Sequence, residues 1–273
     1  MNTVQTQGLT IPRLGFGTFR MVGNECQPVV ETALELGYRH IDTAEMYQNE
    51  EAVGAAIAAS GIPRSALHVT TKVWHDHLAP DAIGRSLETS LGELGLDCVD
   101  LYMVHWPSSS MDLPAVLETI QKLREAGLTR AIGVCNFNMQ LLKIALEDIG
   151  APIACHQVEY HLFLEQEAML RSLRAHGIPL VAYAPLAQGR AENDAVLSRI
   201  GAKHGVTAAQ VAIAWLLDQP GVVAIPKAQR RESQIANLDA LNIRLDDTDR
   251  KAIATLPKNE RFVNPPFAPQ WDA

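Results

Sequence analysis

The chain alternates between short apolar runs and longer segments in which apolar residues recur every three or four positions. Short apolar runs rich in β-branched residues are typical of buried strands, and the longer periodicity is typical of helices that bury one face. Glycine follows several helical segments, as at Gly95 and Gly205, where a helix end commonly needs a left-handed residue. The predicted strands and helices are 14–18 with 28–37, 39–44 with 49–60, 67–73 with 80–95, 99–106 with 113–127, 129–137 with 139–150, 153–161 with 165–177, 179–187 with 194–205 and 207–219, and 222–228 with 231–241.

Eight successive strand–helix units predict a (β/α)₈ TIM barrel, formed as a single domain by residues 1–273. The segment 3–15 is expected to form a short hairpin that closes the barrel bottom. The tail from Pro257 is expected to be irregular and to lie over the barrel. The alternative is an open, doubly wound sheet with a G-x-G-x-x-G turn after its first strand. The segment "GFGTFR" has the first two glycines of that turn, but Arg20 stands where the third belongs.

Composition and charge exclude several classes of protein. The chain has 23 Lys and Arg against 31 Asp and Glu, and this net charge of −8 disfavours general binding to nucleic acid or anionic membranes. No run approaches the roughly 20 apolar residues of a membrane span, and the N-terminus does not resemble a secretory signal. The four cysteines form no C-x-x-C pair, so we expect no zinc site, no disulfide framework and a cytoplasmic location. We also expect a monomer.

Four polar residues lie near the predicted carboxyl ends of strands, where (β/α)₈ enzymes carry their reacting groups. Asp42 and Tyr47 follow the second strand, Lys72 lies in the third, and His105 ends the fourth. Each has a structural explanation alone: Asp42 could cap a turn, and His105 could be a satisfied core histidine. Together, Asp42 and Lys72 can compensate each other's charge in a dry pocket. Lys72 is expected to lower the pKa of Tyr47 from about 10, so that Tyr47 can protonate an oxygen that His105 orients. This set predicts carbonyl reduction with a hydride from a cofactor.

Several segments together resemble the aldo-keto reductases over the whole chain. The resemblance implies an NADPH-dependent reductase whose tetrad is Asp42, Tyr47, Lys72 and His105, with Tyr47 as the general acid. The segments "VETALELGYRHIDTAEMYQNE" and "APQWD" are similar to a bacterial branch that reduces 2,5-diketo-D-gluconate and methylglyoxal, which implies small aldehydes and ketones as substrates. The matching segments are "GFGTFR", "YRHIDTAEMYQNE", "TTKVW", "VDLYMVHWP", "IGVCNF", "HQVEYH", "AYAPLAQG" and "IPKAQRRESQIANL".

The resemblance also implies how NADPH would bind. Asn136 and Gln157 would hold the carboxamide, Tyr183 would stack on the nicotinamide, and the loop 185–189 would pass over the pyrophosphate. The cations of "IPKAQRR" stand at a predicted helix start and suit a 2′-phosphate, although they could instead form a solvated turn. The predicted cofactor-binding residues are Thr18, Asn136, Gln157, Tyr183, Pro185, Leu186, Gln188, Gly189, Lys227, Arg230, Arg231 and Asn237.

Some positions depart from the family pattern. Cys135 and Ala184 stand where serines are usual, and Ala228 and Ser233 replace a serine and an arginine after Lys227. Carboxamide anchoring is therefore expected to be looser, and the preference for NADPH less strict.

The substrate pocket is expected to be shallow and open, because the connection "PSSSMDL" and the tail are short. His75 and His77 have no third ligand in the sequence pattern, so no metal is predicted. The predicted substrate-binding residues are Phe19, Trp74, His105, Trp106 and Trp271.

Three alternatives to a dedicated small-carbonyl reductase remain open at the level of sequence. One is a broad aldehyde-detoxifying reductase. Another is a non-catalytic subunit that senses NADPH for a partner, which the intact tetrad disfavours. The most distant is a metal-dependent barrel hydrolase.

Overall fold

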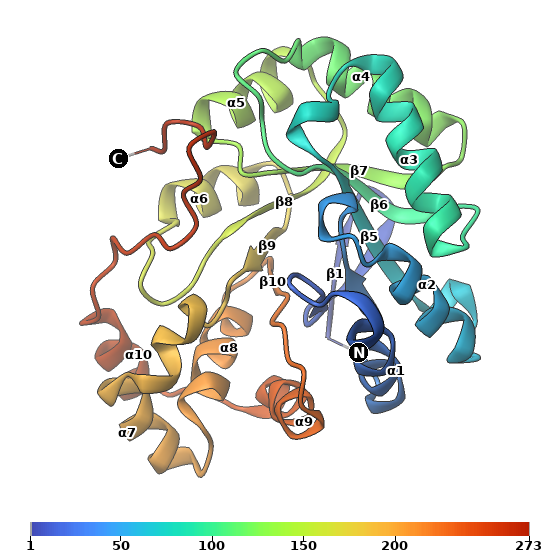
Figure 1. The fold of residues 1–273 in the computed structure, drawn as a ribbon. Helices are drawn as coiled ribbons and strands as arrows, with labels where there is room; N and C mark the ends of the chain where they lie inside the picture. The colour runs from blue at the N-terminus through green and yellow to red at the C-terminus, as the bar shows by residue number, and fades with distance from the viewer. Residues whose placement is uncertain (1, 273) are drawn as a thin grey trace.

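The computed structural model describes residues 2–272, in which strands alternate with helices (Figure 1). The strands are β1 (Thr3–Thr6), β2 (Leu9–Pro12), β3 (Phe16–Gly17), β4 (His40–Asp42), β5 (His68–Val73), β6 (Val99–Val104), β7 (Thr129–Cys135), β8 (Ile153–Glu159), β9 (Leu180–Tyr183) and β10 (Val222–Ala224). The α-helices are α1 (Cys26–Leu36), α2 (Glu50–Ala59), α3 (Pro80–Leu94), α4 (Leu113–Glu125), α5 (Met139–Lys143), α6 (Glu167–Ala175), α7 (Ala195–His204), α8 (Ala208–Asp218), α9 (Arg231–Asp239) and α10 (Asp247–Ala254).

The strands β3 to β10 form one parallel sheet in sequence order, and helices surround it (Figure 1). Backbone hydrogen bonds join its two edges: the Gly15 N–H donates to the Ala224 carbonyl at 2.8 Å, and the Ala224 N–H donates to the Arg13 carbonyl at 2.9 Å. The sheet thereby closes on itself, and the predicted (β/α)₈ barrel is confirmed. The open doubly wound alternative is wrong.

The two glycines of "GFGTFR" make this closure possible. A Cβ on Gly15 would lie 2.6 Å from Nδ1 of His40, and a Cβ on Gly17 would lie 2.7 Å from the Ile225 carbonyl oxygen. Real Cβ atoms do not approach other atoms so closely, so glycine is required where β3 approaches the segment after β10. Close packing in the barrel therefore explains the two glycines Gly15 and Gly17, which also match the first part of a dinucleotide-binding turn.

The core has an inner and an outer layer. Inside the barrel, Leu101, Met103 and Val223 pack with Leu9 and Ile11 of the N-terminal hairpin. The hairpin strands β1 and β2 pair antiparallel as predicted, and the Thr6 hydroxyl donates to the Ala154 carbonyl at 2.7 Å. A larger cluster fills the space between the sheet and the helices. Strands β5, β6 and β8 are buried at every position, as expected for a parallel sheet covered on both faces.

Two elements differ from the sequence prediction. The predicted helix 139–150 is α5 followed by a π-helical turn, η5 (Ile144–Asp148). Helix α10 was not predicted, because it has only eight residues and half of them are charged. Its signal was a capping box, in which Asp246 and Asp249 each accept a hydrogen bond from the other's backbone N–H.

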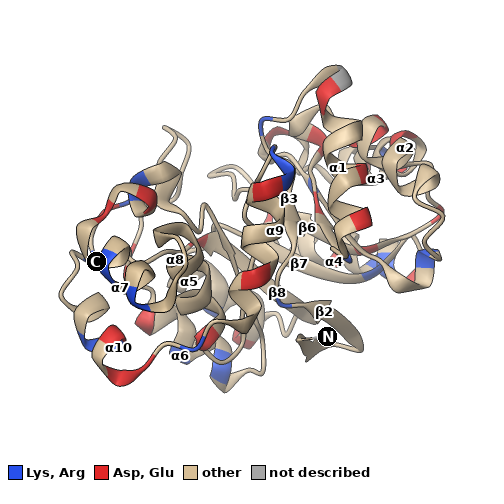
Figure 2. Ribbon diagram, turned by 90° about the horizontal axis from the view of Figure 1, so that it is seen from below, with Lys and Arg blue, Asp and Glu red and all other residues tan. Residues whose placement is uncertain are grey.

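The surface mixes both signs of charge. In the view from below, α9 carries both Arg and acidic residues, whereas α1 and α2 carry acidic residues without Lys or Arg (Figure 2). Among residues 2–272, no helix is both long enough and apolar enough to cross a bilayer. The tail after α10 is irregular, as predicted, and it extends from α10 past α6 towards α5 (Figure 1).

Candidate active site

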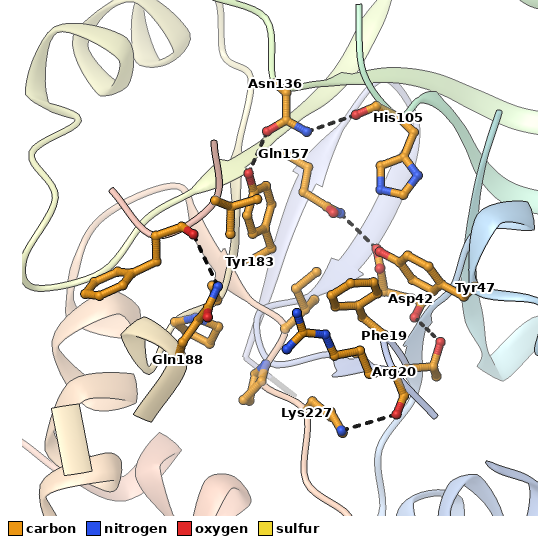
Figure 3. Close-up of a pocket in the computed structure, with 18 of the residues that line it drawn as sticks. Phe19, Arg20, Asp42, Tyr47, His105, Asn136, Gln157, Tyr183, Gln188 and Lys227 are labelled. Carbon is orange, nitrogen blue, oxygen red and sulfur yellow. Dashed lines mark hydrogen bonds between the residues drawn. The ribbon is translucent and has the colours of Figure 1, made fainter. Parts of the chain in front are cut away.

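A cavity of about 710 Å³ opens at the carboxyl ends of the barrel strands, a size typical of small-molecule sites (Figure 3). Its walls come from strand ends, from the loop after β9 and from the C-terminal tail. Most of the predicted site residues therefore meet in one place. Those that line the cavity are Thr18, Phe19, Asp42, Tyr47, Trp74, His105, Trp106, Asn136, Gln157, Tyr183, Pro185, Leu186, Gln188, Gly189 and Lys227.

Lys72 and Asp42 form a buried ion pair at the cavity floor. Parallel pairing of β4 with β5 brings the two strand ends together. The Lys72 ammonium donates to Oδ1 of Asp42 at 2.5 Å and to the Thr43 carbonyl at 2.8 Å, and the lysine side chain is fully buried. The Gln157 amide donates to the other carboxylate oxygen of Asp42 at 2.8 Å. Both carboxylate oxygens of Asp42 therefore accept hydrogen bonds. The Lys72 ammonium is held between Asp42 and the Thr43 carbonyl.

Tyr47 and His105 lie beside this pair. The Lys72 ammonium is 5.1 Å from the centre of the Tyr47 ring, and the Tyr47 and His105 rings are 5.5 Å apart in an edge-to-face arrangement. Tyr47 belongs to a 3₁₀ turn, η2 (Glu45–Tyr47), directly after β4. Nδ1 of His105 is buried and has no hydrogen-bond partner within the described chain. A phenol and an imidazole therefore stand together at the cavity floor.

The expected lowering of the Tyr47 pKa is wrong in its net direction. Burial raises the pKa of Tyr47 to about 12, and the Lys72 ammonium offsets this only in part. Burial also lowers the pKa of His105 well below its usual range, and Lys72 and His75 add to that shift. For Lys72, burial lowers the pKa, but Asp42 and Tyr47 outweigh burial and the net shift is upward. Near neutral pH, Tyr47 is thus protonated, His105 is neutral and Lys72 is charged.

Two side-chain amides connect the tetrad to the adjoining wall. The Asn136 amide donates to the His105 carbonyl at 2.9 Å and accepts from the Tyr183 hydroxyl at 2.7 Å. Its backbone N–H donates to the Gln157 carbonyl at 2.9 Å. Asn136 and Tyr183 are therefore joined through their side chains beside the catalytic candidates, whereas the Gln157 side chain binds Asp42 (Figure 3). Cys135, in place of a serine, lies 3.8 Å from the Met103 sulfur inside the barrel.

Unusual backbone conformations concentrate around the cavity. Arg20, Asn136, Ala184 and Gln188 all have positive φ, between 47° and 60°, and all four line it. Non-glycine residues adopt such conformations at a cost of about 1–3 kcal/mol each. Their clustering at one cavity supports a functional role for it.

Two cations stand at the end of the cavity opposite His105 and Asn136 (Figure 3). The Lys227 ammonium donates to the Arg20 carbonyl at 3.4 Å, and both side chains line the cavity. Arg20 was not among the predicted site residues. The signal for it in the sequence is its position in "GFGTFR", in the loop that follows β3 at the carboxyl end of the barrel.

Five predicted site residues lie outside the cavity lining, and one of them is Lys72, the fully buried partner of Asp42. Arg231 is exposed and pairs with Glu35 of α1 at 3.1 Å, and Arg230 is exposed at the start of α9. Asn237 is buried beside Tyr38. Trp271 donates to Oδ1 of Asn264 at 2.9 Å and packs behind Trp106, with 6.1 Å between ring centres.

The wall near His105 is aromatic. Trp74 lies 5.2 Å from the His105 ring, and Phe19 lies 5.0 Å from the Tyr47 ring. Phe267 of the tail packs edge-on against Trp74 and Trp106, at 5.6 Å from each. The tail residues that line the cavity, which the sequence analysis missed, are Phe262, Val263, Asn264, Pro265 and Phe267.

Comparison with known proteins identifies the fold family. A model of the aldo/keto reductase family matches residues 13–257. The chain belongs to this family. It is 46% identical over 269 residues to the methylglyoxal reductase DkgB of Escherichia coli O157:H7, covering 97% of this chain and 100% of that protein. It is 38% identical to the glyoxal reductase of Bacillus subtilis strain 168, covering 93% and 92% of the two chains.

Solved structures agree with this assignment. A crystal structure described as a 2,5-diketo-D-gluconic acid reductase B superposes with a TM-score of 0.96 at 41% identity, covering 99% of this chain and 97% of that one. The aldose reductase of Schistosoma japonicum superposes with a TM-score of 0.88 at 27% identity, covering 93% and 91%. As an aldo-keto reductase with reductase relatives, the protein is an oxidoreductase that acts on small carbonyl compounds.

Proposed function

We propose that this aldo-keto reductase reduces small aldehydes and ketones with NADPH, and that Tyr47 donates the proton. The observation that carries the proposal is the meeting of Tyr47 and His105 with the buried Asp42–Lys72 pair at one cavity floor. Methylglyoxal and 2,5-diketo-D-gluconate are the substrates to test, because relatives bear the names of reductases of these compounds.

The protonation states support acid catalysis by Tyr47. A phenol with a pKa of about 12 holds its proton at neutral pH, and an alkoxide is a more basic acceptor than a phenolate. The Lys72 ammonium stabilises the phenolate that remains after proton transfer, and Asp42 keeps Lys72 in place. Neutral His105 can donate a hydrogen bond to the carbonyl oxygen and orient it towards Tyr47.

The cavity suits a nicotinamide dinucleotide. When bound, this cofactor supplies the hydride for carbonyl reduction. Asn136 and Gln157 offer amide groups for a carboxamide, and Tyr183 offers an aromatic ring beside them. At the other end, Arg20 and Lys227 offer positive charge for phosphates. Arg230 and Arg231, at the start of α9, are proposed to read a 2′-phosphate from outside the lined cavity, with Thr18, Asn237 and the loop 185–189 as further contacts.

We also propose that the protein acts as a single-domain monomer in the cytoplasm. Its four cysteines are free, and three of them, Cys26, Cys135 and Cys155, are buried, which suits a reducing compartment. Phe19, Phe262 and Phe267 are among its exposed large apolar side chains, and all three line the cavity.

The replacement Tyr47→Phe tests the proposal. We expect it to lower kcat/KM at least about 100-fold for methylglyoxal and for 2,5-diketo-D-gluconate, because it removes the proposed proton donor and leaves the rest of the site in place. NADPH consumption followed by absorbance measures the rate, and fluorescence titration checks that NADPH still binds.

Tyr102→Phe is the matched control. It removes a phenol from a neighbouring barrel strand, but its hydroxyl faces the Ile83 carbonyl on the outer side of the sheet. Turnover that survives in Tyr47→Phe would remove the catalytic assignment. NADPH binding without Tyr47-dependent turnover of either substrate would favour the non-catalytic sensing role.

A further inference from the structure

The C-terminal tail, residues 259–272 and here called the strap, forms one wall of the cavity but has no helix or strand of its own. Its Phe267 stacks on His75 with 4.0 Å between ring centres and packs edge-on against Trp74 and Trp106. A segment without regular structure keeps its position only if other groups hold it. The anchors of the strap therefore decide the shape of this wall.

The strongest anchor is the carboxylate of Glu159, the last residue of β8. It is fully buried, and its two oxygens accept the backbone N–H groups of Phe262 at 2.8 Å and Val263 at 3.0 Å. The Arg261 guanidinium stands 3.7 Å from the same carboxylate. Hydrogen bonds from backbone amides to a buried carboxylate are about twice as strong as neutral ones. Glu159 thus binds three consecutive residues of the strap.

A histidine of the barrel also binds this anchor, and its ring lies 5.4 Å from that of Phe262 in the strap. His161 lies 3.0 Å from Glu159 through Nε2, and its Nδ1 accepts the Phe163 N–H at 3.2 Å. Because Nδ1 is the acceptor, Nε2 carries the proton and donates to Glu159. Oε1 of Glu159 therefore accepts from both His161 and the Phe262 N–H, which joins the barrel to the strap through one oxygen.

The strap also connects the cavity walls to one another. Nε of Arg190 pairs with Glu260 at 3.2 Å, and the Gln188 amide donates to the Phe262 carbonyl at 3.4 Å (Figure 3). Both of these partners belong to the turn η6 (Ala187–Asn193) that follows β9.

At its far end, the strap is tied to the start of α5. The Asn138 amide donates to the Gln270 carbonyl at 3.0 Å, and the Met139 N–H donates to Asp272 at 2.8 Å. The strap therefore joins the proposed cofactor loop to the aromatic substrate wall, and Glu159 holds it between those two ends.

We propose that Glu159 is a positioning residue that holds the strap closed over the cavity and thereby sets both cofactor retention and the KM for the carbonyl substrate. It does so without touching either ligand, since it is not part of the cavity lining. The inference rests on the proposed NADPH-dependent reduction. One buried carboxylate then controls two binding steps. The strap residues that it binds include Phe262, which contacts the cofactor loop, and Phe267 follows a few residues later against the aromatic wall.

The test compares Glu159→Gln and Glu159→Ala with the native protein. Glutamine keeps one acceptor oxygen but presents an N–H₂ group to donors, so the strap loses one of its two amide bonds. We expect NADPH to dissociate about 10-fold faster and the KM for methylglyoxal to rise about 10-fold in Glu159→Gln, with a larger change in Glu159→Ala and a smaller change in kcat. Stopped-flow quenching of the cavity tryptophans Trp74 and Trp106 follows dissociation.

Asp100→Asn is the matched control. Asp100 is also a buried carboxylate on a barrel strand, and it accepts the Val69 N–H at 2.8 Å and pairs with Arg64 and Arg130, each at 2.7 Å. It lies at the start of β6, at the opposite end of the barrel. We expect its replacement to lower the Tm without changing NADPH dissociation or KM. Glu260→Gln, which removes only the link to Arg190, should accelerate dissociation less than the Glu159 variants.

Hydrogen exchange of the cofactor-free protein separates this inference from the proposed function. Peptides covering residues 259–267 should exchange faster in Glu159→Gln and unchanged in Asp100→Asn. Unchanged exchange, or NADPH dissociation and KM that match the native protein despite a lower Tm, would overturn the positioning role. If the native protein neither binds NADPH nor reduces methylglyoxal, the proposed function fails, while the exchange result still decides whether Glu159 anchors the strap.

Discussion

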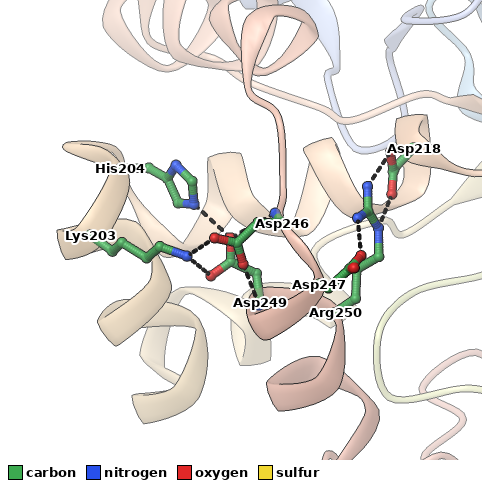
Figure 4. Close-up of polar contacts among 7 residues, drawn as sticks. All are labelled: Lys203, His204, Asp218, Asp246, Asp247, Asp249 and Arg250. Atoms are coloured by element: carbon green, nitrogen blue, oxygen red, sulfur yellow. Dashed lines mark hydrogen bonds and ion pairs between the residues drawn. The ribbon is translucent and has the colours of Figure 1, made fainter.

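Two Asp–Lys pairs in this barrel have similar geometry and very different surroundings. Lys72 and Asp42 are 2.5 Å apart at the cavity floor, with side-chain exposures of 0% and 2%. Lys203 and Asp249 are 2.8 Å apart between α7 and α10, with exposures of 44% and 3% (Figure 4). The distances alone would assign both pairs the same role.

Their other partners show how the pairs differ. In the Lys203–Asp249 pair, here called the outer pair, Asp249 also binds His204 at 2.7 Å and accepts the Asp246 N–H at 3.0 Å. Asp246 itself binds Lys203 (Figure 4). This network fastens α10 to α7. The Lys72–Asp42 pair, here called the inner pair, joins two strands that are already paired through their backbones. Its lysine lies beside the ring of Tyr47.

Desolvation explains why this difference matters. A fully buried ion pair repays little of its desolvation cost, so its retention calls for a reason other than stability. A network with one partner in water has no such cost on that side and serves as a surface clamp. Burial, more than distance, therefore separates a candidate catalytic pair from a structural one.

The largest predicted effect comes from breaking the inner pair. Asp42→Asn or Lys72→Met alone leaves an uncompensated buried group, and each should lower the free energy of unfolding by about 3–5 kcal/mol and abolish reduction. The double variant Asp42→Asn/Lys72→Met should recover most of that stability, because no buried charge remains, yet stay inactive. Urea unfolding and NADPH consumption measure the two effects separately.

The test depends on the double variant regaining stability without regaining activity. Recovered activity in the double variant would mean that Lys72 does not support Tyr47. Stability that does not recover would mean that the pair is structural, like the outer one.

The barrel and the meeting of the tetrad could be predicted from the sequence because both follow from periodicity and connectivity. Eight strand–helix units place Asp42, Lys72 and His105 at strand ends on one rim, whatever the details of packing. The pKa of Tyr47 could not be predicted in this way. Its direction depends on how much water the cavity walls exclude, and the sequence showed Lys72 but not the depth of burial.

The tail shows a second limit of sequence reasoning. Its irregular path was predicted, but Trp271 was expected in the pocket and Phe267 was not. The structure places Phe267 against Trp74 and puts Trp271 behind Trp106. A segment without periodicity gives no rule for which aromatic residue faces inward, and here anchors distant in sequence, above all Glu159, decide it.

A smaller effect is expected from the outer pair, and it should depend on pH. Burial raises the pKa of Asp249, but hydrogen bonds from Lys203, His204 and the Asp246 backbone outweigh it and lower the pKa to about 2. The unfolded value is about 3.9, so the stabilisation is fully present above that pH and is lost as pH falls towards 2. Asp249→Asn should lower the Tm at pH 7 by a few degrees and flatten its decline below pH 5.

Thermal unfolding across this pH range checks the prediction, and kcat/KM at pH 7 should stay at the native value. A loss of turnover in Asp249→Asn would show that the two pairs are coupled through the fold. An unchanged acid limb of the Tm profile would mean that other carboxylates account for acid unfolding.

The smallest effect is expected at an ion pair more exposed than either of these, between Arg231 and Glu35. Both side chains are more than half exposed, so the pair contributes little to stability. Replacing both Arg230 and Arg231 with Ala should leave the Tm unchanged but raise the Kd for NADPH several-fold more than the Kd for NADH, because only NADPH carries the 2′-phosphate. Glu35→Gln is the control, since it releases Arg231 without removing a cation, and it should tighten NADPH slightly. Equal weakening of both cofactors in the double variant would assign the phosphate contact to Lys227 and Arg20, the two cations that line the cavity itself.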